Sequence, residues 1–241
     1  MDWSWETVQS YIGDPLFVNA AFVTVWVAVV SQAIGVVVGL IVAIGQISNN
    51  SVLRKIAYSY VWFWRGSPLL AQLFLLYFGL PQFGIHLSVI EAGLIGLGLN
   101  ASGFMAEIIR GALLSIDRGQ LEAARSLGMS QRATMWYTIM PQAIRLVIPP
   151  LGNEFNGNLR TTSLLSVISF EELLRVTTLA INETFRPIEL YFVASLYYLA
   201  MTSVWTIIQM NLERRFGKGI DNRFRSNSSI KGVLKKLIYR G

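Results

Sequence analysis

The chain has 241 residues, of which 53% are hydrophobic and only 14% are charged. Because soluble domains carry about 25% charged residues, this composition indicates an integral membrane protein with about four to six spanning helices. The chain has no cysteine and one histidine, which excludes disulfides, thiolate chemistry and a histidine metal site, so no metal is expected. Of its 20 Lys and Arg residues, nine follow Asn211, a pattern typical of membrane topology and not of nucleic-acid binding.

Residues 1–15 are acidic and contain no Lys or Arg, so they do not begin as a secretory signal does. Trp5, Val8 and Ile12 recur at helical spacing, and tryptophan is common at membrane boundaries. We interpret residues 1–15 as an extracytoplasmic tail. It contains either a short interfacial helix or an exposed, frayed segment.

Five apolar runs follow, and each is long enough to cross a membrane. They cover Leu16–Ile47, Ile56–Leu80, Ala92–Ser115, Ala143–Ile168 and Leu190–Met210. The first contains Gly35 and Gly39, whose spacing allows another helix to approach closely. The second is interrupted by WRGSP at Trp64–Pro68. The sequence therefore predicts an all-α integral membrane protein with five transmembrane helices, its membrane domain covering residues 16–212.

The segments between these runs differ in positive charge. Those on one side hold fourteen Lys and Arg residues, including the nine of the basic tail 213–241, and those on the other side hold two. Because Lys and Arg collect in cytoplasmic loops, we expect the N-terminus outside and the C-terminus in the cytoplasm. Apolar residues within 230–238 alternate with lysines, which predicts either contact with lipid of the inner leaflet or a solvated, unfolded tail.

The cytoplasmic segment 117–141, called the elbow below, contains the sequence LEAARSLGMSQRATMWYTIMP. Strong helix formers predict a short helix over Leu121–Leu127. Gly128 is placed to end it in a left-handed C-cap, and Ser130 to cap a second helix. Pro141 disfavours helical geometry at Met140, so the second helix is expected to end there. A solvated loop with incidental helicity is the alternative.

The elbow sequence EAARSLGMSQRATMWYTIMP closely resembles the EAA loop of bacterial ABC importer permeases. The residues that match at the family's spacing are Glu122, Ala123, Ala124, Gly128 and Pro141. Thr138 and Met140 depart from the family's pattern, which has Ile and Leu at these two positions. The stretches FWRGSPLLAQLFLLYFGLPQFGI, LNASGFMAEIIRGALLSIDRGQ, PPLGNEF and TSLLSVI further resemble the polar amino acid uptake branch, over about residues 17–212.

This resemblance implies the type I ABC importer permease fold in a bacterial inner membrane. It implies a subunit of an ATP-driven importer for a polar amino acid or a similar small polar solute. The elbow would be the coupling helix, which docks on a separate cytoplasmic ATPase dimer through Glu122, Ala123, Ala124, Arg125 and Gly128. A second permease subunit and an extracytoplasmic solute-binding protein complete the expected partners. The chain itself has no phosphate-binding loop, so we expect no catalytic residue and no cofactor here, with ATP and Mg²⁺ held by the ATPase.

Two polar stripes run along the third and fourth apolar runs at helical spacing. They consist of Gly96, Asn100, Gly103, Glu107 and Arg110, and of Glu154, Asn158, Thr161 and Leu165, with Ser163 beside them. Polar residues inside a membrane face the bundle interior, where they line a passage or join helices. Glu107 and Arg110 lie near the cytoplasmic end, and for them we favour contacts between helices.

For the other polar residues we favour a solute passage. Glu154 suits the ammonium group of a zwitterion, and the remaining passage residues are Asn100, Asn158, Thr161 and Ser163. The resemblance supports this choice, because related permeases contact substrate through the Asn of LN and the acidic residue of NE. Thr161 stands where relatives often carry aspartate, which lowers the expectation of a basic amino acid unless a partner permease supplies the charge.

Two other functions remain as alternatives. One is an ATP-independent secondary transporter or channel, against which the missing inverted repeat and the EAA pattern count. The other is a non-transporting, ATPase-linked scaffold, against which the two polar stripes count.

Overall fold

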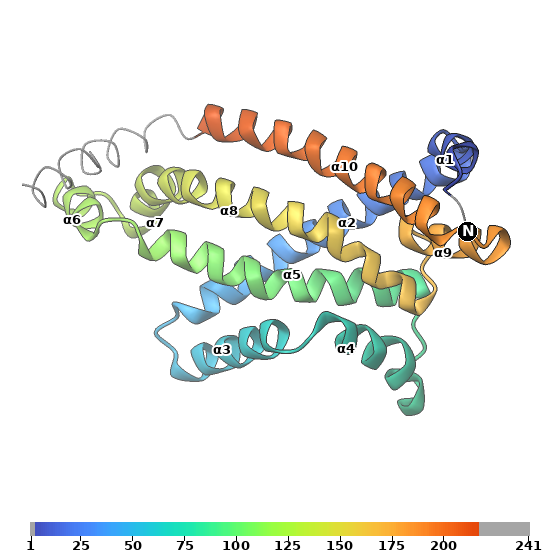
Figure 1. Cartoon of the computed structure of the whole chain (residues 1–241). Coiled ribbons are helices and arrows are strands. Elements are labelled where there is room, and N and C mark those ends of the chain that lie inside the picture. The colour runs from blue at the N-terminus through green and yellow to red at the C-terminus, as the bar shows by residue number, and fades with distance from the viewer. Residues whose placement is uncertain (1–2, 217–241) are drawn as a thin grey trace, which may run out of the picture.

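The computed structural model describes residues 3–216, which form helices and contain no strand (Figure 1). The helices are α1 Trp5–Ile12, α2 Pro15–Gln46, α3 Ser51–Gly66, α4 Leu69–Phe74, α5 Val89–Leu114, α6 Arg118–Ser126, α7 Gln131–Ala133, α8 Met140–Thr161, α9 Leu173–Thr184 and α10 Pro187–Phe216. Short π-helical or 3-10 segments are η1 Leu75–Gly79, η2 Leu80–Phe83, η3 Thr134–Ile139 and η4 Thr162–Ile168. The predicted lipid contact of residues 230–238 lies outside the described residues.

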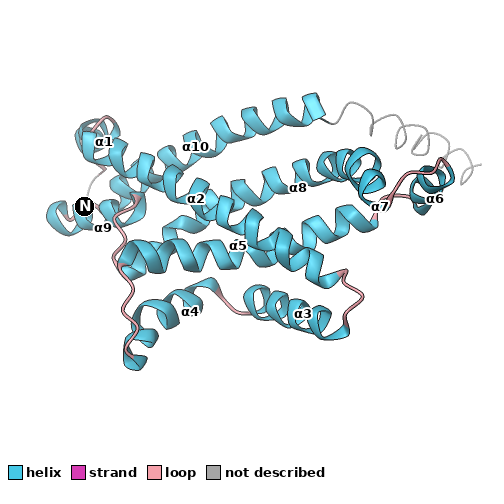
Figure 2. Ribbon diagram, turned by 180° about the vertical axis from the view of Figure 1, so that it is seen from behind, coloured by secondary structure: helices cyan, strands magenta, loops and turns pink. Residues whose placement is uncertain are grey.

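The long helices lie side by side as a bundle. α5 packs against α2, α3 and α8, and α10 lies on the far side of α8 (Figures 1 and 2). Three helices, α2, α5 and α10, are each long and apolar enough to cross a membrane. They correspond to the first, third and fifth predicted spans. The fourth is occupied by α8 and η4.

The second predicted span is two helices with a break between them. α3 ends at Gly66, Ser67 is extended with φ −101° and ψ 145°, and α4 begins after Pro68. Proline has no backbone N–H and disfavours helical geometry in the residue before it, which explains why the helix stops at this point. The interruption at WRGSP is therefore a true helix break.

The predicted close approach at Gly35 and Gly39 is confirmed. A Cβ atom added to Gly35 would lie 2.8 Å from Ala101 Cβ, and one added to Gly39 would lie 2.5 Å from Met105 Cβ. The α2 backbone therefore rests directly on α5 with no room for a side chain. Such contacts are how membrane helices gain packing energy without a hydrophobic driving force.

The N-terminal residues form a helix, so the frayed alternative is wrong. The side chain of Ser4 accepts a hydrogen bond from Thr7 N at 3.3 Å and caps α1. Val8 is 4% exposed and packs in a core with Phe17 and Leu190. This core holds α1 against the start of α2 and α10. The position of α1 at a membrane surface stays a prediction.

The turn chemistry of the elbow is confirmed. Gly128 has φ +79°, and its N–H donates to Arg125 O at 2.9 Å in a left-handed cap that closes α6. Glycine adopts this geometry without the steric cost that a Cβ would impose. Ser130 Oγ accepts from Ala133 N at 3.3 Å and starts the next helix.

The expected helix end at Pro141 is wrong. Met140 is helical, with φ −57° and ψ −42°, and the helix continues through Pro141 into α8. The preceding segment η3 is π-helical, and Met140 N–H donates to Met135 O, five residues back. A π-turn widens the helix and relieves the clash between the proline ring and the carbonyl four residues earlier. Gln142 Nε2 also donates to Thr138 O at 2.8 Å.

Candidate functional site

The elbow exposes most of the residues that the sequence singled out. Glu122, Ala123, Arg125 and Gly128 are all exposed. Ala124, which was also expected to take part in docking, is only 5% exposed. α6 packs against η3, and one face of a short helix must supply that contact. The surface left for a partner therefore consists of Glu122, Ala123, Arg125 and Gly128.

Asn100 lies at the break between α3 and α4. Its Nδ2 atom donates to Trp64 O at 3.0 Å and to Gln72 Oε1 at 3.1 Å. Gln72 Nε2 in turn donates to Trp64 O at 3.0 Å, and to Ser67 O at 3.2 Å and Ser67 Oγ at 2.8 Å. Two carbonyls at the end of α3 therefore have side-chain donors. In lipid, where water is missing, an unpaired carbonyl would cost several kcal/mol.

Sequence reasoning missed Gln72 altogether. It is 2% exposed and lies four residues after Pro68 in an otherwise apolar segment. A glutamine inside an apolar run beside a proline was the available signal, because a helix break frees carbonyls that need a donor.

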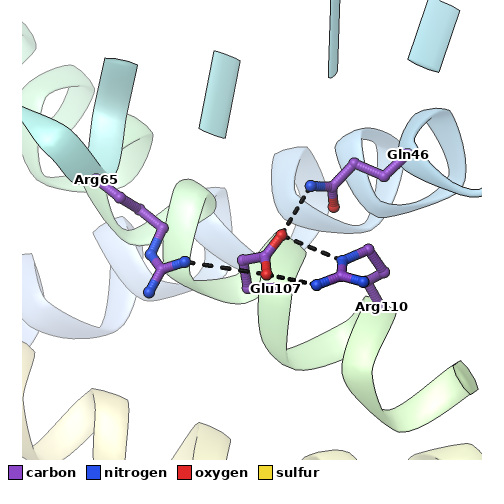
Figure 3. Close-up of polar contacts among 4 residues, drawn as sticks. All are labelled: Gln46, Arg65, Glu107 and Arg110. Atoms are coloured by element: carbon purple, nitrogen blue, oxygen red, sulfur yellow. Dashed lines mark hydrogen bonds and ion pairs between the residues drawn. The ribbon is translucent and has the colours of Figure 1, made fainter. Parts of the chain in front are cut away.

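Glu107 is the centre of a polar cluster that joins α2, α3 and α5 (Figure 3). Arg110 donates to both carboxylate oxygens, through Nε at 3.2 Å and through NH2 at 2.7 Å. Gln46 Nε2 donates to Glu107 Oε1 at 2.7 Å, and Arg65 NH1 lies 4.0 Å from Oε2. The interpretation as a contact between helices is confirmed for Glu107, whereas the hydrogen bonds of Arg110 to Glu107 stay within α5. Gln46 is a partner that the sequence did not indicate.

The residues of the α8 stripe make different contacts. Asn158 is 7% exposed, and its Nδ2 atom donates to Ala28 O at 3.2 Å and to Ser31 Oγ at 3.0 Å on α2. Glu154 and Thr161 are partly buried. Asn158 thus joins helices, and the residues of the stripe are not all brought to one place.

The hydroxyl groups of the stripe donate within their own helix. Thr161 Oγ1 donates to Gly157 O at 3.0 Å, and Ser163 Oγ donates to Arg160 O at 2.8 Å. Their lone pairs are left as acceptors.

α8 and α10 meet through polar contacts. Trp205 Nε1 donates to Gly152 O at 2.8 Å, and Gln209 Nε2 donates to Asn153 Oδ1 at 3.1 Å. Beside them the two helices form an open groove of about 530 Å³. Its lining residues are Asn156, Arg160, Leu199, Thr202, Ser203, Thr206 and Ile207.

A buried carboxyl group that the sequence did not indicate caps α9. Glu172 is 0% exposed; its Oε1 atom accepts from Arg175 N at 2.8 Å and its Oε2 atom from Tyr198 OH at 2.9 Å. Burial raises the pKa of this carboxyl, although these donors act in the opposite direction. Among residues 3–216 no three acidic or histidine side chains are grouped as metal ligands would be.

A bundle of apolar helices with a broken second span, polar residues inside it and an exposed helical elbow defines a multi-pass membrane transport subunit. The chain belongs to the family of binding-protein-dependent transport system inner membrane components, whose model matches residues 35–218. The predicted family is therefore confirmed, and the chain is the permease subunit of an ABC import system in the inner membrane. Membership implies an ATPase and a solute-binding protein as partners in general, and it does not favour the ATP-independent alternative.

Curated relatives cover most of the chain. The arginine transport system permease protein ArgU of Corynebacterium glutamicum is 37% identical over 231 residues, which are 90% of this chain and 73% of that protein. The probable amino-acid ABC transporter permease protein YckA of Bacillus subtilis is 37% identical over 84% of this chain and 89% of its own length. The glutamine transport system permease protein GlnP of Escherichia coli K12 is 33% identical over 89% of this chain and 98% of its own length.

Solved structures confirm the type I importer fold. A chain from a crystal structure of an amino acid ABC transporter with histidines is 38% identical and superposes with a TM-score of 0.84, over 89% of this chain and 100% of that one. A chain of the MetNI methionine ABC transporter in an inward-facing conformation has a TM-score of 0.70 at 20% identity. The match covers 83% of this chain and 96% of that one.

Proposed function

We propose that this chain carries a polar amino acid or a similar small polar solute across the inner membrane, with ATP hydrolysis supplied by a separate ATPase dimer. The observation that carries the proposal is the elbow, whose exposed Glu122, Ala123, Arg125 and Gly128 form a rigid, capped surface outside the apolar helices. The relatives' names, which specify arginine, glutamine and nopaline, support the solute class.

The elbow is connected to both helices that carry the polar stripes. α6 follows α5 after three residues, and η3 continues without interruption into α8. A force applied to α6 therefore reaches α5 and α8 directly. Movement of the ATPase would change the position of these helices, and alternating access of the solute site would follow. The charge difference between the connecting segments supports a cytoplasmic elbow and C-terminus and an external N-terminus.

Within the membrane domain, Glu154 is proposed to accept the ammonium group of the solute. The hydroxyl oxygens of Thr161 and Ser163, and the carbonyl oxygen of Asn100, are proposed as further acceptors for the solute. The amide of Asn158 is used by α2, so this residue supports the site by holding α8 in place. A second permease subunit, identical or similar to this one, is proposed to complete the passage.

Replacement of Glu122 by Gln and of Gly128 by Ala tests the coupling surface. We expect the double variant to insert in the membrane but to lose co-purification with the ATPase, because an exposed charge is removed and an alanine is strained at φ +79°. Glu183→Gln, an exposed glutamate on α9, is the matched control. Normal assembly of the double variant would contradict the coupling role of the elbow.

Glu154→Gln tests the solute site in liposomes that contain the whole importer. We expect uptake to fall by about tenfold or more, the value of one charge-assisted hydrogen bond, while basal ATP hydrolysis stays within about twofold. An equal fall of both quantities would indicate a folding role for Glu154. Thr161→Asp in the same assay is expected to favour arginine or lysine over glutamine.

A further inference from the structure

Arg65 is a charged residue inside the second predicted span that the proposed solute site does not use. It is the penultimate residue of α3, directly before the helix break, and its side chain is 41% exposed. A guanidinium group within a membrane domain is costly and is usually paired or functional. The question is which group uses its hydrogen-bond donors.

The side chain of Arg65 is held in place by α5. Its guanidinium carbon lies 5.0 Å from the centre of the Phe104 ring, within the range of a cation–π contact. A Cβ added to Gly103 would lie 3.0 Å from Arg65 Cγ, so the aliphatic stem rests on the α5 backbone. The planar group is thus positioned by packing before any anion binds.

The carboxylate with which Arg65 forms an ion pair is already hydrogen-bonded to other residues. Glu107 accepts three hydrogen bonds of 2.7–3.2 Å, two from Arg110 and one from Gln46, whereas Arg65 NH1 stays 4.0 Å from it (Figure 3). Arg65 donates no hydrogen bond to any residue in the described range 3–216. Its fork of N–H donors is exposed and available, in the geometry that binds a carboxylate through two parallel hydrogen bonds.

Arg65 on α3 and Glu154 on α8, the proposed acceptor for the ammonium group, belong to two helices that both contact α5. The preceding residue, Trp64, is bonded through its carbonyl to Asn100. The two helices that pack on α5, which carries Asn100, therefore supply a cation and an anion. This is the charge arrangement that a zwitterion requires, since its carboxylate and ammonium groups must be neutralised together in a low-dielectric environment.

We infer that Arg65 binds the carboxylate of the transported amino acid while Glu154 binds its ammonium group. The inference rests on the proposed function and adds the anion-binding residue that the polar stripes lack. Arg110 is unsuitable, because its Nε and NH2 groups already donate hydrogen bonds to Glu107. Arg160 lines the groove between α8 and α10, and its Nε donates to Asn156 O at 3.4 Å.

The test uses the complete importer in liposomes. The solute supplied for uptake is whichever of L-arginine, L-glutamine and L-histidine the wild-type complex transports. Uptake and the ATP hydrolysis stimulated by loaded binding protein are measured for Arg65→Gln, Arg65→Lys and the matched control Arg160→Gln. We expect Arg65→Gln to lower uptake by about tenfold or more with ATP hydrolysis within about twofold, because a charge-assisted pair is lost. Arg65→Lys should restore part of the uptake at a raised apparent KM, since an ammonium cannot reproduce the bidentate fork.

Three outcomes would overturn the inference while leaving the proposed function intact. They are unchanged uptake by Arg65→Gln, an equal loss of uptake and ATP hydrolysis, and an equal loss of uptake by Arg160→Gln. If Arg65→Gln does not assemble, Arg65→Lys decides, and an unchanged KM would overturn the assignment. Absence of uptake by the wild-type complex would instead remove the proposed function itself.

Discussion

The two faces of α5 are held by different kinds of contact. On one face, Gly35 and Gly39 of α2 rest on Ala101 and Met105 with no space between them. On the other face, Asn100 reaches across to the broken span and donates to the carbonyl of Trp64. The first contact depends on volume and the second on hydrogen bonds to freed backbone groups. A helix between two partners can therefore be fixed to each by a different physical term.

The largest effect is expected from Gly39→Ala on the volume-determined face. The new Cβ would lie 2.5 Å from Met105 Cβ and 2.9 Å from Ser102 O, and neither atom is the end of a flexible side chain. We expect destabilisation by about 3 kcal/mol or more, because the two backbones must separate. The thermal midpoint of the purified permease in detergent measures it. Gly111→Ala on α5, where nothing lies within 4 Å, is the control and should be neutral.

A smaller loss is expected from Asn100→Ala on the hydrogen-bonded face. It removes the donor to Trp64 O and to Gln72 Oε1, which should cost about 1–3 kcal/mol. Because Gln72 also donates to Trp64 O, the two residues act as a unit, and the double Ala variant should lose less than the sum of the single variants. Additive losses would show that the two amides act independently.

Gly96→Ala is expected to have a weaker effect than Gly39→Ala, although both glycines face a close neighbour. The added Cβ would lie 2.6 Å from Leu73 Cδ2, a terminal methyl group of a side chain on α4. A terminal methyl group shifts more easily than a backbone, so we expect a cost of about 1 kcal/mol, at the lower end for overpacking. A thermal midpoint as low as that of Gly39→Ala would contradict the distinction between backbone and side-chain contacts.

The smallest expected effect is a dependence of stability on pH. It arises at Glu172, which belongs to neither face of α5. Burial raises the pKa of this carboxyl in the folded chain, so stability that is present below its unfolded pKa is lost as pH rises through the folded pKa. Glu172→Gln cannot ionise. The thermal midpoint of the variant minus that of the wild type should therefore increase between about pH 4 and pH 8. A difference independent of pH would show that Glu172 does not titrate in this range.

The fold was predictable where one local signal dominates. The bounds of the first apolar run differ from those of α2 by one residue at each end. A long segment without charge forms a helix in a membrane, because its backbone groups must be hydrogen-bonded within the segment. Gly128 and Ser130 formed the predicted caps because their preference is set by their own backbone and side chain. Pro141 was misjudged because the outcome depended on the π-helical η3 before it, a property that no single residue encodes.

The candidate site was predictable in residue type but not in direction. Spacing placed Glu154 and Asn158 on one stripe, yet Asn158 turns to α2 and Glu154 does not. The choice is made by Ser31 and the Ala28 carbonyl, which are more than 120 residues away in sequence. Ala124 is similar, because its burial depends on η3. Side-chain direction inside a bundle is a tertiary property, and periodicity narrows it only to a face.

The shared hydrogen bonds of Gln72 and Asn100 restrict how segments of this chain can be exchanged with those of relatives. The carbonyls of Trp64 and Ser67 belong to the second span, but one of their two donors belongs to α5. A chimaera that takes only residues 51–83 from a relative would contain the relative's helix break and any donor within that segment. Its α5 would still come from this chain, and the two would not have been selected to form these hydrogen bonds together. Functional hybrids should therefore form more readily when the second span and α5 are transplanted as a single block.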